Sequence, residues 1–447
     1  MFPRKICHYL TQWKVKKERK PLILRGARQV GKTSAVLIFG KEHFKNIIQL
    51  NLENVEHKRL FSKEVSLEDF EKIVQIKFRQ KIIPGDTLVF IDEIQNSPAL
   101  IRLLRFFYEQ RPDVHVIAAG SLFQAKIETE GFSLPVGRIE YAYVYPLDFF
   151  EYLEACEETE LLSFLKSMSP KKNIPDAIHF ETLRHFHEYS MIGGMPEIVN
   201  AYLANHNIES LKPIYSSLLT SYTEDVYKYS SLANTKYLSY VIEQAPLFAG
   251  TIITYNKFGG SNFRTREMSA AFDTLEKVML VYQIHATKSS EIPLIKQRKR
   301  PKKLLFLDVG LVNQQMGIQE EFIKLKDLNA FYRGRIAEQV VGQNILAQIT
   351  YHIPDILYWA KGKQEGSAEL DFCMQAGGKI LGIEVKAGGA GKLRSLFSFA
   401  DAVRNNRLMR IYNGHLKNEK VKLGGKNYEF LSVPFYLSPR ILDLLSL

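Results

Sequence analysis

Five short apolar runs, separated by longer segments, mark the first 150 residues of the chain. They look like strands: Leu22–Leu24, Ile47–Leu50, Leu88–Ile91, Val114–Ala119 and Ile139–Val144. The segments between them have room for crossover helices, so the pattern predicts a parallel, doubly wound sheet with flanking helices. Before the first run, four apolar residues follow helical spacing and predict a short amphipathic helix: Ile6, Tyr9, Leu10 and Trp13.

After Pro146 the pattern becomes mostly helical, up to about residue 244. The turn GGMPE (Gly193–Glu197) interrupts it, and we expect this turn to join two helices rather than to bend one toward a ligand. Beyond residue 246, a helical segment precedes two strand-like runs, Val281–Ala286 and Leu304–Leu307. A helix followed by a two-stranded wing with a basic tip is the layout of a winged helix. From about Arg333, a helix, a hairpin and further α/β texture complete the chain.

The charge balance of the 447 residues favours basic side chains. Lys and Arg number 60 against 48 Asp and Glu, which gives a formal net charge of +12. This excess can attract an anionic partner such as nucleic acid, and a solvated basic surface without a partner explains it equally well.

Cysteine usage and hydropathy indicate the compartment. The three cysteines, Cys7, Cys156 and Cys373, are far apart and form no CxxC pair, which argues against a disulfide framework or a zinc site and fits a reducing compartment. No apolar run reaches the roughly 18 residues of a membrane span, and the charged N-terminal segment has no signal-peptide core. We therefore expect a cytoplasmic protein with no membrane partner.

The segment GARQVGKT (Gly26–Thr33) fits the nucleotide-binding pattern G-x-x-x-x-G-K-[ST] and follows an apolar strand. Its glycines let the backbone curl so that N–H groups face a phosphate, and the next helix adds its positive end. Lys32 should reach the β- and γ-phosphates, and the Thr33 hydroxyl should ligate Mg²⁺. We expect the nucleotide to contact the loop and the start of the helix: Gly26, Ala27, Arg28, Gln29, Val30, Gly31, Lys32, Thr33 and Ser34.

An acidic pair ends the apolar run of TLVFIDEIQ, where a nucleotide site of this kind needs a metal-side carboxylate. We expect Asp92 to hold Mg²⁺ through water and Glu93 to orient and polarise the attacking water. Ser121, at the end of the next strand, is the candidate γ-phosphate sensor. Turnover also needs a charge-neutralising arginine. Arg138 is our candidate, with a salt-bridged surface arginine as the equal alternative, and Arg28 is a weaker one.

Seven motifs occur here in the order in which one family carries them: GARQVGKT, FIDEIQ, AAGS, LPVGR…YPLDFFEYL, GGMPE, FLDVGL and ELDF…IEVKAG. From about Pro21 to about Ser398, the chain resembles prokaryotic AAA-type P-loop ATPases that carry a C-terminal domain of unknown function 4143. The resemblance implies ATP rather than GTP, a helical and winged-helix middle, and a C-terminal module similar to the PD-(D/E)xK nuclease fold. The family's nucleotide-site positions correspond here to Lys32, Thr33, Asp92, Glu93 and Ser121.

We therefore expect an α/β multidomain protein with four parts. Residues 1–150 are expected to form an AAA-type P-loop ATPase domain with a parallel sheet, and residues 151–245 a helical region. Residues 246–325 are expected to form a winged-helix-like domain, and residues 326–447 an α/β domain like the PD-(D/E)xK nucleases.

A two-glycine hairpin signal, Gly377–Gly378, lies between the apolar segments AELDFCMQ and KILGIEVK. A two-residue turn there places Asp371 opposite Glu384 and Glu369 opposite Lys386, all on one side of the hairpin. Facing carboxylates repel each other, and a divalent cation such as Mg²⁺ or Mn²⁺ between them reverses that repulsion.

The other side of this hairpin is apolar, so we expect Leu370 and Phe372 to face a core together. With a metal present, Lys386 would neutralise a developing phosphate oxyanion or position a water, as in metal-assisted phosphodiester cleavage. The resemblance adds Glu338, on the preceding helix, as a fourth participant. A solvated sheet face with no metal is the alternative.

Six of the eight residues from Lys296 to Lys303 are basic: Lys296, Arg298, Lys299, Arg300, Lys302 and Lys303. With Arg264 and Arg266, at the start of the predicted recognition helix, they form a candidate clamp for the phosphates of double-stranded DNA. A solvated charge run is the alternative.

Three functions fit these features. The first is a Mg²⁺-dependent ATPase that couples its nucleotide state to a DNA-binding winged helix and a nuclease-like module. The second is a nucleotide-gated scaffold or switch with negligible turnover, and the third is an ATP-gated, metal-dependent DNA nuclease. ATP is the expected ligand in each case, and the partner is a second copy of the chain or an unidentified protein.

Overall fold

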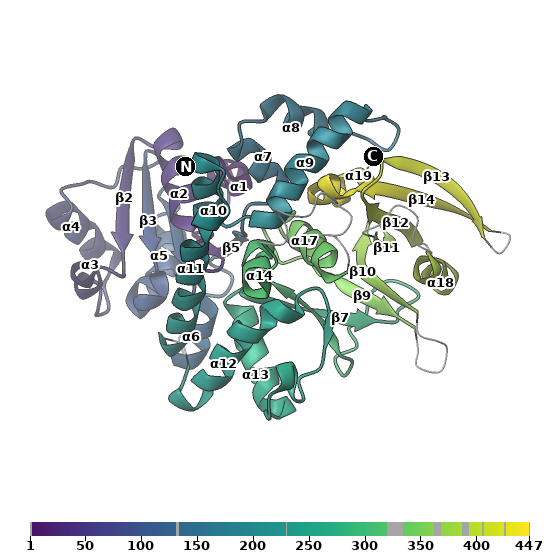
Figure 1. Cartoon of the computed structure of the whole chain (residues 1–447). Helices are drawn as coiled ribbons and strands as arrows, with labels where there is room; N and C mark the ends of the chain where they lie inside the picture. The colour runs from purple at the N-terminus through teal and green to yellow at the C-terminus, as the bar shows by residue number, and fades with distance from the viewer. Residues whose placement is uncertain are drawn as a thin grey trace.

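Two sheets lie on opposite sides of the molecule, with a layer of helices between them (Figure 1). The computed structural model describes residues 2–130, 134–228, 230–319, 334–361, 368–386, 393–404, 406–423 and 426–446. In this part of the chain, none of the helices combines the length and the apolar character that a bilayer span requires.

The N-terminal sheet has five strands: β1 (Leu22–Arg25), β2 (Asn46–Asn51), β3 (Thr87–Asp92), β4 (His115–Gly120) and β5 (Glu140–Tyr143). Their order is β2-β3-β4-β1-β5, and all neighbours are parallel. Successive side chains of a strand point to opposite faces. Phe90 accordingly packs in one buried cluster with α2 (Lys32–His43), and Val89 in another with α5 (Pro98–Gln110). Helices thus cover both faces, as the sequence predicts.

The predicted N-terminal helix is α1 (Lys5–Lys14), and its apolar side faces the same core as α2. Ile6, Leu10 and Trp13 are buried. The helix therefore fixes the N-terminal segment, including Arg4 at its N-cap, against the first sheet.

Helices fill the middle of the chain: α7 (Phe149–Ala155), α8 (Thr159–Lys166), α9 (Asp176–Ile192), α10 (Pro196–Asn205), α11 (Lys212–Asp225) and α12 (Leu232–Gln244). The GGMPE turn joins α9 to α10, as predicted. Helix α9 lies between the two sheets, together with α14 (Val309–Met316) and α17 (Arg335–Leu346) (Figure 1).

Helix α13 (Thr265–Lys277) precedes an antiparallel pair, β7 (Val281–Thr287) and β8 (Lys302–Phe306), as the winged-helix pattern predicts. The pair is not a separate wing, however, because β7 also pairs in parallel with β9 (Leu357–Ala360). Pairing between strands so distant in sequence leaves no local signal. The predicted winged helix thereby shares its sheet with the C-terminal region, and the domain boundary at residue 325 stays a prediction.

The second sheet is mixed and has nine strands in the order β13-β14-β12-β11-β10-β9-β7-β8-β6. Its remaining strands are β6 (Ile252–Ile253), β10 (Glu369–Ala376), β11 (Lys379–Lys386), β12 (Asn406–Tyr412), β13 (Lys417–Leu423) and β14 (Lys426–Pro434). Helix α17 packs on one face and α18 (Arg394–Ala402) on the other.

The β10–β11 hairpin has the predicted register, with Phe372 opposite Ile383. Both residues of the Gly377–Gly378 turn have positive φ, 55° and 70°, which glycine adopts without strain. Beyond Leu370 a β-bulge shifts the register with β9. Leu370 therefore packs with Phe399 of α18 instead of sharing a core face with Phe372, so that part of the sequence prediction is wrong.

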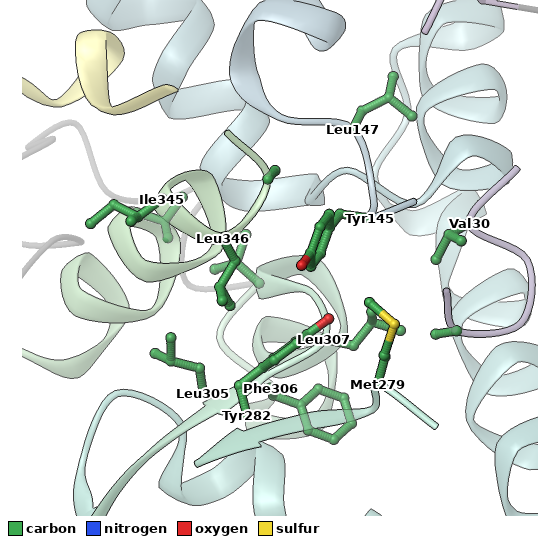
Figure 2. Packing of buried hydrophobic residues seen from close by; sticks show 14 of the residues in the cluster. Val30, Tyr145, Leu147, Met279, Tyr282, Leu305, Phe306, Leu307, Ile345 and Leu346 are labelled. Carbon is green, nitrogen blue, oxygen red and sulfur yellow. The ribbon is translucent and has the colours of Figure 1, made fainter. Parts of the chain in front are cut away.

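One buried apolar cluster is continuous between the two sheets. Figure 2 shows Tyr145, which follows β5, near Tyr282 of β7, with ring centroids 6.2 Å apart. Val30, from the loop before α2, and Leu346, from α17, belong to the same cluster. The two sheets therefore share a core, and a close-packed core transmits a displacement of one sheet to the other.

Candidate functional site

The loop from Gly26 to Gly31 connects β1 to α2 at the edge of the first sheet where the strands end. Two glycines are required there for different reasons. A Cβ on Gly26 would lie 2.4 Å from the carbonyl oxygen of Val144, and Gly31 has a φ of +91°. The loop is therefore tight and leads directly into α2, and loops of this kind hold a phosphate with their N–H groups and the start of the helix.

Lys32 is buried at the start of α2, and its Nζ donates to the carbonyl oxygens of Gly26 (3.0 Å) and Ala27 (2.7 Å). Burial lowers the pKa of Lys32, and Glu93 and Asp92 oppose that effect. Phosphate oxygens are stronger acceptors for an ammonium than backbone carbonyls are. The Lys32 ammonium is therefore preorganised to exchange its loop contacts for a phosphate.

Thr33 and Asp92 meet at the predicted metal position. The Thr33 hydroxyl donates to Asp92 Oδ2 at 2.7 Å, and burial raises the pKa of Asp92. A hydroxyl and a carboxylate next to a phosphate-binding loop are hard oxygen ligands, which Mg²⁺ prefers. The donor set therefore fits magnesium.

Glu93 has a left-handed backbone, with φ 53° and ψ 45°, which costs a non-glycine residue roughly 1–2 kcal/mol. Its carboxylate accepts a hydrogen bond from the Gln95 amide, and the Ser121 hydroxyl donates to the same oxygen at 3.4 Å. The structure thus brings Glu93 and Ser121 together, as the sequence reasoning expects. Strain of this kind is maintained where the surrounding structure fixes a side chain in a required place.

Arg138 lies away from these groups. Its Nε donates to Glu109 at 2.9 Å, and its side chain is 43 % exposed. The reason is topological, because Arg138 precedes β5, whereas the nucleotide loop lies at the opposite edge of this parallel sheet, where strands end. Its position matches the surface salt bridge that was the alternative and does not support a catalytic role.

Arg28 is the arginine of the loop that lines the cavity over Lys32 and Thr33, a cavity of about 520 Å³. Its guanidinium contacts Asp225, at the end of α11, at 2.6 Å and Glu53 at 3.6 Å. Arg28 therefore connects the loop to the middle helices.

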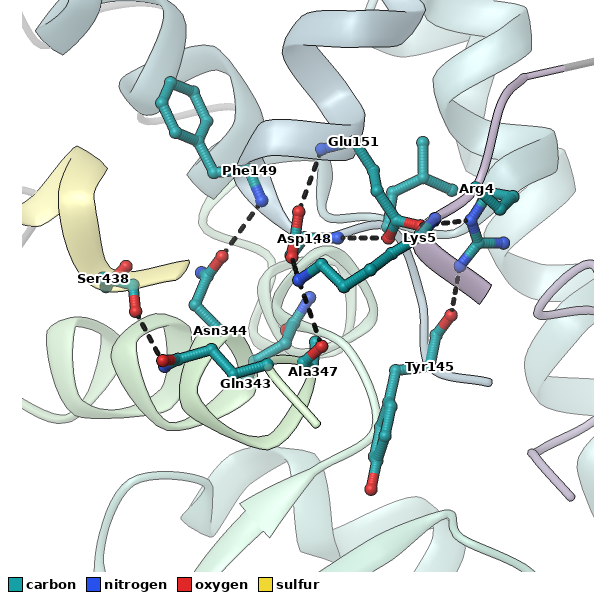
Figure 3. Close-up of polar contacts among 12 residues, drawn as sticks. Arg4, Lys5, Tyr145, Asp148, Phe149, Glu151, Gln343, Asn344, Ala347 and Ser438 are labelled. Carbon is teal, nitrogen blue, oxygen red and sulfur yellow. Dashed lines mark hydrogen bonds and ion pairs between the residues drawn. The ribbon is translucent and has the colours of Figure 1, made fainter. Parts of the chain in front are cut away.

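Sequence reasoning missed further cavity residues that carry no motif: Phe2, Arg4, Asn51, Glu53 and Asn200. Arg4 is buried and donates to the carbonyl oxygens of Val30 and Tyr145, both at 2.7 Å, while its Nε contacts Glu151 at 2.9 Å (Figure 3). Pro196 and Glu197 also line the cavity, so the GGMPE turn both joins two helices and borders the nucleotide site.

The four residues predicted for the nuclease-like site lie near one another, but a fifth residue changes the picture. Lys303 Nζ lies 2.5 Å from Glu338 and 3.2 Å from Asp371. Lys386 pairs with Glu384 at 2.5 Å rather than with Glu369. In the described part of the chain, no group of three or more acidic, His or Cys residues is arranged to hold a metal ion.

The protonation of this cluster follows from its burial. Burial, and repulsion from Asp371, raise the pKa of Glu338 and of Glu384 to about 7 each. Burial alone would lower the pKa of Lys303, but Asp371 and Glu338 raise it. A Lys303 ammonium already lies between two of the carboxylates, so the residues present do not fit a divalent metal.

The predicted phosphate clamp is largely engaged with the protein itself. Lys296 pairs with Asp355, Arg300 donates to two backbone carbonyls near the end of β9, and Lys302 donates to Gln283. Four of the six basic residues, Lys303 included, are therefore not the free surface cations that the sequence suggested. The other four residues of the predicted clamp are exposed: Arg264, at the N-cap of α13, Arg266, Arg298 and Lys299.

Comparison with known proteins agrees with this geometry. The model of an AAA domain matches residues 18–153, that of the domain of unknown function 8612 residues 183–321, and that of the domain of unknown function 4143 residues 333–436. The chain has an AAA domain followed by the domain of unknown function 4143. This confirms the architecture that the motif order predicts.

Solved structures were also compared. The RuvB Holliday junction branch migration motor of Thermotoga maritima is 16 % identical, with 63 % of this chain and 90 % of that chain covered and a TM-score of 0.30. The Aeropyrum pernix ORC1 protein in complex with DNA is 12 % identical, with 72 % and 92 % covered and a TM-score of 0.25. At such TM-scores neither structure carries an argument about this chain. No curated protein matches it.

Proposed function

We propose that the protein is a Mg²⁺-dependent ATPase whose nucleotide state acts on the rest of the chain through the helices between the two sheets. The observation that carries the proposal is the set of contacts around Lys32, in which Thr33 is bonded to Asp92 and Glu93 to Ser121. Metal ligand, acid and polar sensor thereby lie in one place, at the edge of the sheet that the nucleotide loop occupies.

Each residue has a role that its contacts define. Lys32 binds the β- and γ-phosphates, and Thr33 and Asp92 would hold Mg²⁺, which supplies charge neutralisation when bound. Glu93 orients the attacking water and accepts its proton, because Gln95 and Ser121 fix its carboxylate. Arg28 is the arginine placed to compensate charge on the phosphates.

The test measures ATP binding and turnover on the full chain, with and without duplex DNA. Glu93→Gln should keep ATP affinity and lower kcat about 10²- to 10⁴-fold, since it removes the base. Lys32→Ala should lose affinity, whereas Lys41→Ala, an exposed residue of the same helix, should change neither. Turnover that persists unchanged in Glu93→Gln would reject the role of this acid.

A nucleotide-gated switch with negligible turnover is the second candidate. The observation that favours it is the ion pair between Arg28 and Asp225, which engages the arginine of the nucleotide loop. Multiple turnover in the wild type would exclude this candidate. The four exposed residues of the predicted clamp support duplex DNA as a partner, and stimulation of turnover by DNA would link the two activities.

A further inference from the structure

We propose that Lys303 is the permanent cation of the acidic cluster in the C-terminal domain, and that this cluster binds no catalytic metal. Three carboxylates meet there from three elements: Glu338 from α17, Asp371 from β10 and Glu384 from β11. Their mutual repulsion is relieved either by proton uptake or by a positive charge nearby. The structure supplies that charge from a fourth element, β8.

The position of the ammonium is the first argument. Lys303 Nζ contacts Glu338 Oε2 at 2.5 Å and Asp371 Oδ1 at 3.2 Å. A divalent ion shared by helix α17 and the hairpin would need these same two carboxylates. Lysine and metal are therefore competitors for one place.

The second argument is that Lys303 cannot readily leave. Its side chain is 2 % exposed, and its ammonium lies 5.3 Å from the centre of the Phe372 ring. Its backbone is paired on both sides, to Ile284 of β7 and to Ile252 of β6. Expelling the ammonium would leave a buried charge without a partner, which is strongly unfavourable.

Two of the other carboxylate oxygens of the cluster are also engaged, which further limits where a metal ion could bind. Asp371 Oδ2 accepts the backbone N–H of Val385 at 2.8 Å, and Lys386 contacts Glu384 Oε1. Glu384 Oε2 is buried and has no hydrogen-bond partner among the described residues. With the lysine removed, Glu338, Asp371 and this oxygen become a set of ligands that suits Mn²⁺.

In this interpretation the C-terminal module holds elements together rather than cutting a phosphodiester. Lys303 ties β8 to α17 and to β10, so that the sheet and the helix between the two sheets move as one body. This inference does not depend on ATP turnover, because it concerns the nucleotide-free protein.

The experiment counts Mn²⁺ ions bound to the nucleotide-free full chain by electron paramagnetic resonance. The wild type and Glu384→Gln should bind the same number of Mn²⁺ ions, because the cluster holds none in the wild type. Lys303→Met, which keeps the apolar stem, should gain one ion per chain, and the double variant Lys303→Met/Glu384→Gln should lose it again. Lys302→Met is the matched control on the same strand and should gain none, because Lys302 donates to Gln283 outside the cluster.

Two results would overturn the proposal. One is a wild-type ion that disappears in Glu384→Gln, or Mn²⁺-dependent nicking of plasmid DNA by the wild type that the same change abolishes. The other is a folded Lys303→Met variant, judged by circular dichroism, that gains no ion. If Lys303→Met does not fold, the comparison of wild type with Glu384→Gln still decides.

Discussion

Glu93 combines a left-handed backbone with a carboxylate that two side chains hold, an arrangement that local preference does not produce. Lys32 shows the same principle, because a buried ammonium is kept beside a loop that offers it only carbonyl oxygens. At this scale the site combines a strained backbone at Glu93 with charged groups, Lys32 and Asp92, that burial disfavours. A bound triphosphate and its metal would stabilise such groups by completing their contacts.

Arg28 and Arg138 are the two candidates for the charge-neutralising arginine, and their variants can be compared directly. Arg28→Ala should lower kcat about 10²-fold, since a preorganised donor at a developing charge is lost. Arg138→Ala should leave kcat unchanged, because its guanidinium contacts Glu109 at the other edge of the sheet. Steady-state ATP hydrolysis checks both variants. The opposite result, with Arg138 essential and Arg28 dispensable, would mean that a rearrangement or a second copy of the chain completes the site.

The GGMPE turn sets the position of α10 relative to the nucleotide loop. The Gly194 N–H donates to Asp308 Oδ2, and its carbonyl accepts the Leu147 N–H, both at 2.7 Å. Asp308 is buried at the N-cap of α14, and burial raises its pKa to about 6. The turn is therefore bonded to the segment before α7 and to the N-cap of α14, and these contacts hold the start of α10, where Pro196 lines the cavity.

Gly194→Ala tests this element. A Cβ there would lie 2.0 Å from the carbonyl oxygen of Leu147, so the backbone must move, at a cost of about 1–3 kcal/mol. We expect a lower melting temperature and weaker ATP binding, because α10 shifts away from the cavity. Gly85→Ala is the control, since Gly85 has a positive φ but open space around it. It should lower stability slightly and leave ATP affinity alone; equal effects of both variants on affinity would contradict the role of the turn.

Elements built from local pattern could be predicted from sequence, and contacts between distant segments could not. The five parallel strands follow from apolar runs separated by segments long enough for crossover helices, and the β10–β11 register follows from two adjacent glycines. The parallel pairing of β7 with β9 has no local signal. Lys303 looks like one more cation in a basic run, and only the fold shows that strand β8 carries it into the sheet beside Glu338.

On the scale of the whole molecule, buried polar contacts join the two sheets alongside the shared apolar core. Figure 3 shows Arg4 and Lys5 beside Asp148 and Glu151 at the start of α7, with Asn344 of α17 bonded to the same segment. Lys5 also donates to the carbonyl oxygen that follows α17, at 3.2 Å. Arg4 contacts the nucleotide loop and its neighbour Lys5 contacts the end of α17, so this segment connects the loop to the helix that carries Glu338.

Asp148 is the residue through which this connection can be broken. It is fully buried, it caps α7 in a capping box with Glu151, and it pairs with Lys5. Asp148→Ala removes the N-cap of α7, which costs about 0.5–2 kcal/mol, and leaves the half-buried Lys5 ammonium without its carboxylate. Because the contact lies between the sheets, we expect calorimetry to resolve two melting transitions, one for each sheet. ATP with Mg²⁺ should raise the melting temperature of the first sheet only.

The matched control is Asp86→Ala, which removes the partner of Lys45, a lysine whose side chain is 81 % exposed. A surface pair of this kind contributes about 0–1 kcal/mol, so this variant should melt in one transition like the wild type. In the wild type, ATP with Mg²⁺ should raise the melting temperature of a single transition, because one core and one polar network span both sheets. A single ATP-responsive transition in Asp148→Ala would show that the apolar core alone couples the nucleotide site to the C-terminal domain.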